Sequence, residues 1–211
     1  MPLQRLVLAS NNAKKLSELR AMLADLDLVL VPQGELGIAE AEEPHITFIE
    51  NALAKARHAA AAAGGAAIAD DSGLCVDALG GAPGVVSAHF AAVPAAAGER
   101  EARRRVQDAA NNALLLQRLQ GQAERRAHFV STLVALRHAA DPQPLVAVGR
   151  WPGLILEAPR GEGGFGYDPL MWISELDATV AELDAEAKNH HSHRARAMAQ
   201  LRVLLRQTWQ L

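Results

Sequence analysis

The fold is decided by a stretch near the start of the chain, Leu3-Gln4-Arg5-Leu6-Val7-Leu8-Ala9-Ser10-Asn11-Asn12-Ala13-Lys14-Lys15. Residues 3–10 are mostly apolar and predict a short buried strand. After a tight polar turn, leucines recur at helical spacing, at Leu16, Leu19, Leu23 and Leu26. α/β proteins commonly bind an anion where a strand passes through a turn into a helix. A capped helix with an exposed lysine would show the same pattern.

Strands and helices alternate along the rest of the chain. Thr47 and Glu50 form a capping box, which predicts that a helix begins there and ends at Gly64-Gly65. Further helices are predicted at 99–119 and at about 192–209, and further strands at 66–69, 129–136, 145–151 and 154–158. This alternation predicts an α/β fold with a mixed sheet. The length of 211 residues suits one domain or a two-lobed one.

The composition is that of a soluble globular protein, with 50% apolar and 21% charged residues. Its 21 basic and 24 acidic side chains give a net charge of −3, whereas proteins that follow a nucleic-acid backbone carry a strong basic excess. Residues 1–10 are too few for a signal peptide or a membrane span. The single cysteine, Cys75, excludes an intrachain disulfide. We therefore expect a cytoplasmic protein that binds neither nucleic acid nor membrane.

Two adjacent carboxylates, Asp70 and Asp71, follow the apolar run at 66–69. Neighbouring residues of a strand point to opposite faces, so the two side chains should diverge. Because burying an unpaired charge costs several kcal/mol, a metal, a lysine or hydrogen-bond donors should face each of them. An Asx turn that opens a hairpin is the alternative.

A third carboxylate, Glu43, precedes the helix that carries Lys55. Oxygen ligands of this kind suit Mg²⁺, which binds through one or two carboxylates together with substrate phosphates. An acidic surface loop is the alternative reading, and we keep it for Glu40 and Glu42.

Two segments near the end of the chain could contact a flat ligand. Residues 163–169 interleave glycines with Phe165 and Tyr167, on which a ring could stack, although glycine-rich turns without a ligand are common. Residues 188–194 contain three histidines, but the sequence offers no partner cluster for zinc. His193 and Arg194 fall in the first turn of a helix, where the dipole disfavours cations, so acceptor atoms should lie nearby.

Five motifs occur in the order seen in the inosine/xanthosine triphosphate pyrophosphatases, which the chain resembles from Leu3 to Leu205: residues 9–15, 47–52, 69–74, 163–169, and Lys188 with 192–194. The resemblance implies an elongated mixed sheet flanked by helices, in one two-lobed domain of residues 1–211 with a central active-site cleft. It also implies a homodimer that requires Mg²⁺. The implied reaction is hydrolysis of the small-molecule nucleotides ITP, dITP and XTP to the monophosphate and pyrophosphate, which cleanses the nucleotide pool.

The resemblance also implies a role for each matching residue. The triphosphate would be cradled by Ser10, Asn11, Asn12, Ala13, Lys14 and Lys15, with Lys15 as the main charge and Lys55 as a second contact. Glu43 and Asp71 would hold Mg²⁺, and Asp71 would activate the attacking water with Ser72 beside it. The purine would stack on Phe165, in a pocket lined by Gly166, Tyr167 and Asp168, and would contact Lys188, His193 and Arg194.

Two other functions remain open from the sequence. A related pyrophosphatase of different nucleotide preference would share these motifs, and so would a nucleotide-binding module that does not turn over. The chain also departs from the family pattern at Pro44-His45, which follows Glu43, at His89 and Ala187, and at Lys14, which adds a charge. No departure removes a residue with an implied chemical role.

Overall fold

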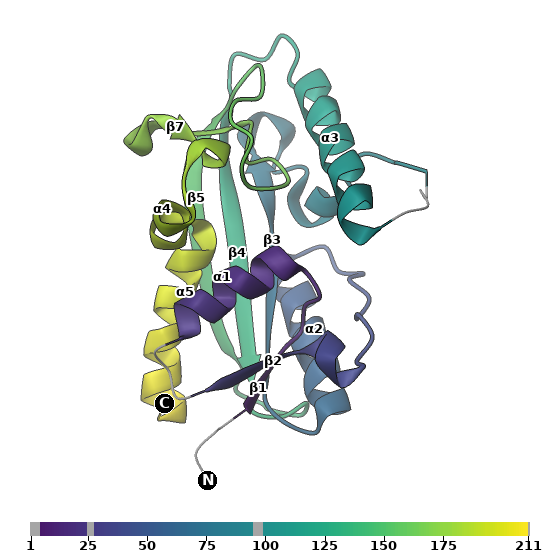
Figure 1. The fold of residues 1–211 in the computed structure, drawn as a ribbon, viewed down its shortest axis with the longest axis vertical. Helices are drawn as coiled ribbons and strands as arrows, with labels where there is room; N and C mark the ends of the chain where they lie inside the picture. The colour runs from purple at the N-terminus through teal and green to yellow at the C-terminus, as the bar shows by residue number, and fades with distance from the viewer. Residues whose placement is uncertain (1–4, 25–27, 95–98, 211) are drawn as a thin grey trace. The chain divides into compact units, whose positions relative to one another are not determined.

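The computed structural model describes residues 5–24, 28–94 and 99–210 (Figure 1). The strands are β1 (Arg5–Leu8), β2 (Val29–Pro32), β3 (Ala67–Val76), β4 (Arg126–Leu136), β5 (Leu145–Ile155), β6 (Met171–Ile173) and β7 (Ala178–Thr179). The helices are α1 (Ala13–Leu23), α2 (Phe48–Ala63), α3 (Arg100–Arg118), α4 (Ala185–His191) and α5 (His193–Leu204), and a last helical turn follows at Leu205–Trp209. Short 3₁₀ turns connect several of these elements.

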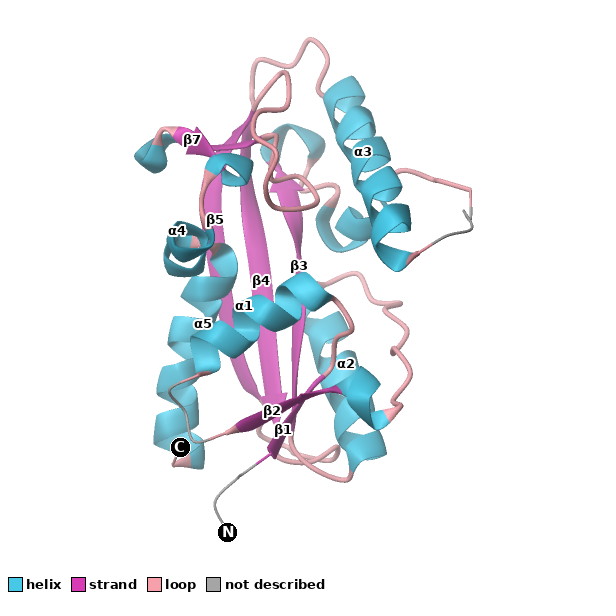
Figure 2. Ribbon diagram, viewed as in Figure 1, coloured by secondary structure: helices cyan, strands magenta, loops and turns pink. Residues whose placement is uncertain are grey.

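The strands form one seven-stranded sheet in the order β2-β1-β3-β4-β5-β6-β7. β1 is parallel to both of its neighbours, with Val7 opposite Val31 of β2 and Ala67 of β3. β6 is antiparallel to β5 and to β7. A mixed sheet flanked by helices is the α/β fold predicted from the sequence, and Figure 2 shows the two kinds of element.

The chain divides into two compact units. Unit 1 comprises Met1–Asp71, Ser131–Arg150 and His191–Leu211, and unit 2 comprises Ser72–Val130 and Trp151–His190. Three of the four divisions fall inside β3, β4 and β5, so each of these strands contributes residues to both units. The fourth falls before His191, the last residue of α4.

In unit 1, alternate residues of the sheet pack into two separate cores. Leu6, Leu8 and Ile68 belong to one core, together with Leu19 of α1 and Met198 of α5. The alternate residues in and directly after these strands belong to the other core, namely Val7, Ala9, Ala67 and Ala69. The α2 side of this core consists of alanines, Ala52, Ala56, Ala59 and Ala60. This two-residue alternation decides which helix each strand residue faces.

The core of unit 2 is built on α3 and on the parts of the strands that lie in this unit. Leu115 and Leu119 of α3 pack with Leu74 of β3 and Trp151 of β5. Tyr167 belongs to the same core.

The aspartate pair lies within a strand, which differs from the alternative of an Asx turn. β3 continues past both aspartates to Val76 because Leu74 and Val76 are buried and preserve the two-residue alternation. Similarly, β5 joins two strands that the sequence predicted separately. Leu3 and Leu26 lie outside the described residues.

Candidate active site

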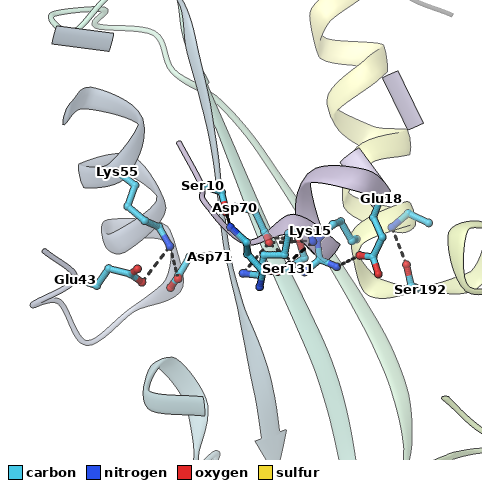
Figure 3. A network of polar contacts seen from close by, with 12 residues as sticks. Ser10, Lys15, Glu18, Glu43, Lys55, Asp70, Asp71, Ser131 and Ser192 are labelled. Carbon is cyan, nitrogen blue, oxygen red and sulfur yellow. Dashed lines mark hydrogen bonds and ion pairs between the residues drawn. The ribbon is translucent and has the colours of Figure 1, made fainter. Parts of the chain in front are cut away.

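β3 directs its two aspartates to opposite faces of the sheet (Figure 3). Asp70 is two residues after Ile68 and so faces the same side of the sheet, where the core includes residues of α1 and α5. Asp71 is two residues after Ala69 and so faces the other side, where the core includes residues of α2. The aspartates are 2% and 4% exposed, and positively charged partners face both of them, as the sequence predicted.

On its face of the sheet, Asp70 holds two cations. Its Oδ2 accepts hydrogen bonds from Nε and Nη2 of Arg194 at 3.2 and 3.1 Å and lies 3.0 Å from Nζ of Lys15. Ser131 of β4 donates to Oδ1 at 2.7 Å. Burial opposes ionisation of Asp70, but Lys15, Arg194 and the Ser131 hydroxyl outweigh it, so the pKa of Asp70 lies well below its usual value. Asp70 is therefore an ionised carboxylate that joins α1 to the start of α5.

Arg194 is 1% exposed, although it lies in the first turn of α5. Ser192 caps this helix by accepting the backbone N–H of Ala195 at 3.2 Å. Arg194 donates to Glu18 of α1 as well as to Asp70, and the two carboxylates offset the unfavourable helix dipole. Burial lowers the pKa of Arg194, but Asp70 and Glu18 raise it further, with a net rise. Sequence reasoning missed Glu18, although it lies three residues after Lys15, on the same face of α1.

Hydrogen bonds from side chains to the backbone shape the N-terminus of α1. Asn12 caps the helix, since its Oδ1 accepts the backbone N–H of Lys15 at 3.4 Å, and the N–H of Asn12 donates to Oγ of Ser10 at 3.2 Å. Gly34 leaves room for Asn11, whose Oδ1 would lie 2.7 Å from a Cβ at that position. Burial lowers the pKa of Lys15 despite the attraction of Asp70. Of the remaining predicted residues in this segment, Ala13 and Lys14 begin α1, and their side chains lie outside the described part of the chain.

On the opposite face, Lys55 of α2 joins two carboxylates. Its Nζ lies 2.7 Å from Oδ1 of Asp71 and 3.0 Å from Oε2 of Glu43. Oδ2 of Asp71 is buried and has no hydrogen-bond partner among the residues that the structure describes. Burial raises the pKa of Asp71 to about 6, against the attraction of Lys55 and with a contribution from the Glu43 carboxylate. Burial also lowers the pKa of Lys55, but the two carboxylates outweigh it and the net pKa is raised.

The loop that carries Glu43 is held by Asn51, a buried residue of α2. The backbone N–H of His45 donates to Oδ1 of Asn51 at 3.0 Å, and Nδ2 of Asn51 donates back to the carbonyl of His45 at 3.1 Å. Thr47 caps α2 by accepting the backbone N–H of Glu50 at 3.3 Å, as predicted. The two bonds to Asn51 therefore fix the backbone of His45, two residues after Glu43, even though Pro44-His45 departs from the family pattern.

In unit 2, Phe165, Asp168 and Lys188 form a second cluster. Nζ of Lys188 lies 2.7 Å from Oδ2 of Asp168 and 4.5 Å from the centre of the Phe165 ring. The backbone N–H of Phe165 donates to the same Asp168 oxygen at 2.9 Å. Tyr167 instead packs in the core, and its hydroxyl donates to the carbonyl of Ser87 at 2.9 Å. The loop thus presents one aromatic ring outside the core, that of Phe165.

The predicted residues therefore form three groups: Lys15 with Arg194, Lys55 with Glu43 and Asp71, and Phe165 with Asp168 and Lys188. His193 is 7% exposed at the start of α5, and Ser72 follows Asp71 on β3. The roles that the resemblance implies for these residues stay predictions.

Two absences concern only residues 5–24, 28–94 and 99–210. Among these residues, no three histidine, cysteine or acidic side chains are placed to hold a metal ion together. None of the helices in these ranges is both long and apolar enough to cross a membrane.

Comparison with known proteins places the chain in a family. The family model described as "Ham1 family" matches residues 6–204. A dITP/XTP pyrophosphatase from Methylibium petroleiphilum is 72% identical over 205 residues, which are 97% of this chain and 99% of the relative. One from Leptothrix cholodnii is 68% identical, over 98% of this chain and 99% of the relative.

A solved structure shares the fold. The HAM1 protein from Coxiella burnetii has a TM-score of 0.87 and 39% identity, over 98% of this chain and 100% of that one. The family match, the high identities and the shared fold all span nearly the whole chain, and so the chain belongs to the Ham1 family.

Proposed function

We propose that this protein hydrolyses non-standard purine nucleoside triphosphates, such as dITP, ITP and XTP, to the monophosphate and pyrophosphate. Two similar relatives are named dITP/XTP pyrophosphatase. One group of side chains carries the proposal. The Lys55 ammonium lies between the carboxylates of Glu43 and Asp71, and Oδ2 of Asp71 is buried next to it. Hydrolysis of a phosphoanhydride needs charge neutralisation and a positioned water more than it needs covalent chemistry.

The same group fits a divalent cation, and we propose Mg²⁺. The buried Oδ2 of Asp71 lacks a partner, and the Glu43 carboxylate contributes to the raised pKa of Asp71, as expected for two carboxylates that face each other. Two carboxylates are a sufficient protein contribution for Mg²⁺, which takes its other ligands from water and phosphates. Glu43 and Asp71 would hold the ion, which supplies positive charge to the triphosphate when bound.

Lys15, Lys55 and Asp71 then have distinct roles in the reaction. The two ammonium groups neutralise phosphate oxygens, and the backbone N–H groups at the start of α1 add to this positive field. The oxygen of water attacks the α-phosphorus, and the bond from this phosphorus to the bridging oxygen of the β-phosphate breaks. One proton of the water passes to the Asp71 carboxylate, which acts as the general base.

We assign recognition of the base to Phe165, Lys188, His193 and Arg194. A purine stacks on the Phe165 ring, and N–H donors bond to the 6-oxo group. Adenine carries an amino donor at that position, so a donor would face a donor, and sites of this kind reject the wrong partner by roughly 10⁴-fold. Asp70 and Glu18 fix the orientation of the Arg194 guanidinium.

The assay that tests this function distinguishes release of pyrophosphate from release of orthophosphate. Purified protein with Mg²⁺ is given ITP, dITP, XTP, GTP and ATP, and orthophosphate is measured with and without added inorganic pyrophosphatase. We expect orthophosphate from ITP, dITP and XTP only when the pyrophosphatase is present. Direct release of orthophosphate, or a preference for ATP, would contradict the proposal. A protein that binds ITP without turnover would be a binding module.

Asp71→Asn should abolish turnover, by at least about 10²-fold in kcat, because it removes the proton acceptor and one metal-binding oxygen. The measurement is pyrophosphate release from ITP, together with circular dichroism to check the fold. Asp77→Asn is the matched control, since Asp77 directly follows β3 but is exposed. Near-normal turnover by Asp71→Asn would remove Asp71 from its role.

Two further proposals rest on the resemblance alone. We propose a homodimer, which sedimentation equilibrium would test, and a cytoplasmic location, where a pyrophosphatase meets the nucleotide pool. A sedimentation mass of about 22.4 kDa would instead indicate a monomer.

A further inference from the structure

A pair of polar side chains on α3 holds the peptide of Gly166, next to Phe165. The backbone N–H of Gly166 donates to Oδ2 of Asp108 at 2.9 Å. Nδ2 of Asn112 donates to the carbonyl of Gly166, also at 2.9 Å. Asp108 and Asn112 are four residues apart, and hence on the same face of the helix. One turn of α3 thus binds both polar groups of a single loop residue more than 50 positions away in the sequence.

Gly166 has a backbone that needs such restraint. Its φ is +62°, in the left-handed region, and nothing lies within 4 Å of where a Cβ would be. Glycine has more conformational freedom than any other residue, so without partners this peptide would sample many orientations. The two bonds from α3 select one of them.

The neighbouring peptide of Phe165 is bound within the loop. Its N–H donates to the side chain of Asp168, and its carbonyl accepts the N–H of Asp168 at 3.2 Å. All four backbone polar groups of Phe165 and Gly166 therefore have partners. Tyr167, the next residue, is anchored in the core of unit 2.

Packing alone does not explain why a polar side chain stands at position 112. Its Oδ1 is buried and has no hydrogen-bond partner among the described residues, which is unfavourable for a buried acceptor. An apolar side chain of similar size would avoid this penalty. Within the part of the chain that the structure describes, the bond to the carbonyl of Gly166 is the contact of Asn112 that an apolar side chain could not replace.

We propose that Asp108 and Asn112 are positioning residues that hold Phe165 in the orientation in which a purine base stacks on its ring. The inference rests on the proposed function, because it assumes that Phe165 contacts the base. Neither residue touches the phosphates in this scheme. Their loss should therefore weaken nucleotide binding while the chemical step is largely retained.

The first test measures kinetics with ITP. Asp108→Ala and Asn112→Leu should each raise KM about tenfold, since each loses one polar contact, and change kcat by less than about threefold. Asp108→Asn keeps an acceptor oxygen for the N–H of Gly166 and should restore KM to within about threefold. Gln117→Ala, on the exposed side of the same helix, is the matched control. A wild-type KM in both Asp108→Ala and Asn112→Leu would overturn the inference.

The second test does not depend on activity. In protein labelled with ¹⁵N-glycine, the exchange rate of the Gly166 amide hydrogen should rise at least about tenfold in Asp108→Ala and stay unchanged in Gln117→Ala. Gly166→Ala identifies the signal. Faster exchange with an unchanged KM would mean that the pair holds the loop without positioning the base, and would overturn the proposed role. If the wild-type protein neither binds nor hydrolyses ITP, the proposed function fails, and the exchange rate still decides whether the pair restrains Gly166.

Discussion

At the scale of single residues, Asp70 is a buried charge held by several partners. It is buried with Arg194 beside the half-buried Lys15, and the side chains of both lie within 3.2 Å of its Oδ2. Removing one partner from a buried ion pair leaves an uncompensated charge, which is more costly than losing the whole pair. The two adjacent aspartates therefore have different surroundings. Asp70 binds two cations through its carboxylate, whereas Oδ2 of Asp71 has no hydrogen-bond partner among the described residues.

Asp70→Asn should lower the free energy of unfolding by about 3–5 kcal/mol, because the half-buried Lys15 would lose its carboxylate and the buried Arg194 would keep only that of Glu18. Urea denaturation at pH 7 measures this change. The control is Glu35→Gln, which breaks the exposed pair of Glu35 with Arg20 and should change stability by less than about 1 kcal/mol. Equal effects of the two substitutions would show that burial does not govern these charges.

A second residue, Asp141, links stability to pH. Its buried carboxylate accepts the backbone N–H groups of Arg137 and Gln143, both at 2.9 Å. Burial opposes ionisation, but these bonds lower the pKa of Asp141 below its usual value. Because the folded state prefers the ionised form, this stabilisation is present above the unfolded pKa near 4 and is lost as pH falls through the folded pKa.

Asp141→Asn should destabilise the protein by about 1–3 kcal/mol at pH 7, since an amide can accept only one of the two N–H groups. The difference from wild type should shrink as pH is lowered below about 4, where the Asp141 carboxylate of the unfolded wild-type chain begins to protonate. Urea denaturation at pH 7 and pH 3.5 measures both values. A difference that does not change with pH would mean that the charge of Asp141 is not involved.

At the scale of elements, β5 and α5 approach unusually closely at Gly149. A Cβ at this position would lie 2.0 Å from the carbonyl oxygen of His193 and 2.4 Å from the N of Ala197. Both atoms belong to the backbone and cannot move aside as a side chain would. The contact lies at the N-terminal turn of α5, which carries His193 and Arg194.

Gly149→Ala should therefore displace α5 and destabilise the protein by about 2–4 kcal/mol through overpacking, with a loss of ITP hydrolysis. Thermal denaturation and the pyrophosphate assay measure the two effects. Gly65→Ala is the control, because its Cβ would meet nothing within 4 Å. If Gly149→Ala behaved like Gly65→Ala, the helix would not depend on this close approach.

At the scale of the whole molecule, the two units are linked through the backbones of β3, β4 and β5, which contribute to both. A strand that loses its order in one unit interrupts its hydrogen bonding in a sheet that both units share. We therefore expect the units to unfold together, with no stable half-folded form.

Tryptophans in each unit make this expectation testable. Trp151 and Trp172 lie in unit 2, and Trp209 lies in unit 1. Unfolding curves from tryptophan fluorescence, recorded for wild type and for Trp209→Phe, should each coincide with the far-ultraviolet circular dichroism of the same protein. Two separated transitions would contradict the expectation.

The sequence by itself determined the fold class, because hydrophobic spacing and capping residues are local properties. Alternation of strands and helices predicted the α/β fold, and Thr47, Gly64 and Ser192 marked ends of helices that the structure confirms. The divergence of Asp70 and Asp71 also followed from the sequence, since a strand alternates its side chains.

Only the tertiary structure decided which partners these residues have. Glu18 and Ser131 reach Arg194 and Asp70 because α1, α5 and β4 come together, and no spacing within one segment encodes that approach. The bonds from α3 to Gly166 likewise join distant parts of the chain. Local periodicity predicts which face a residue occupies, but the packing of whole elements decides which charge or peptide it meets there, because burial requires every polar group to find a partner.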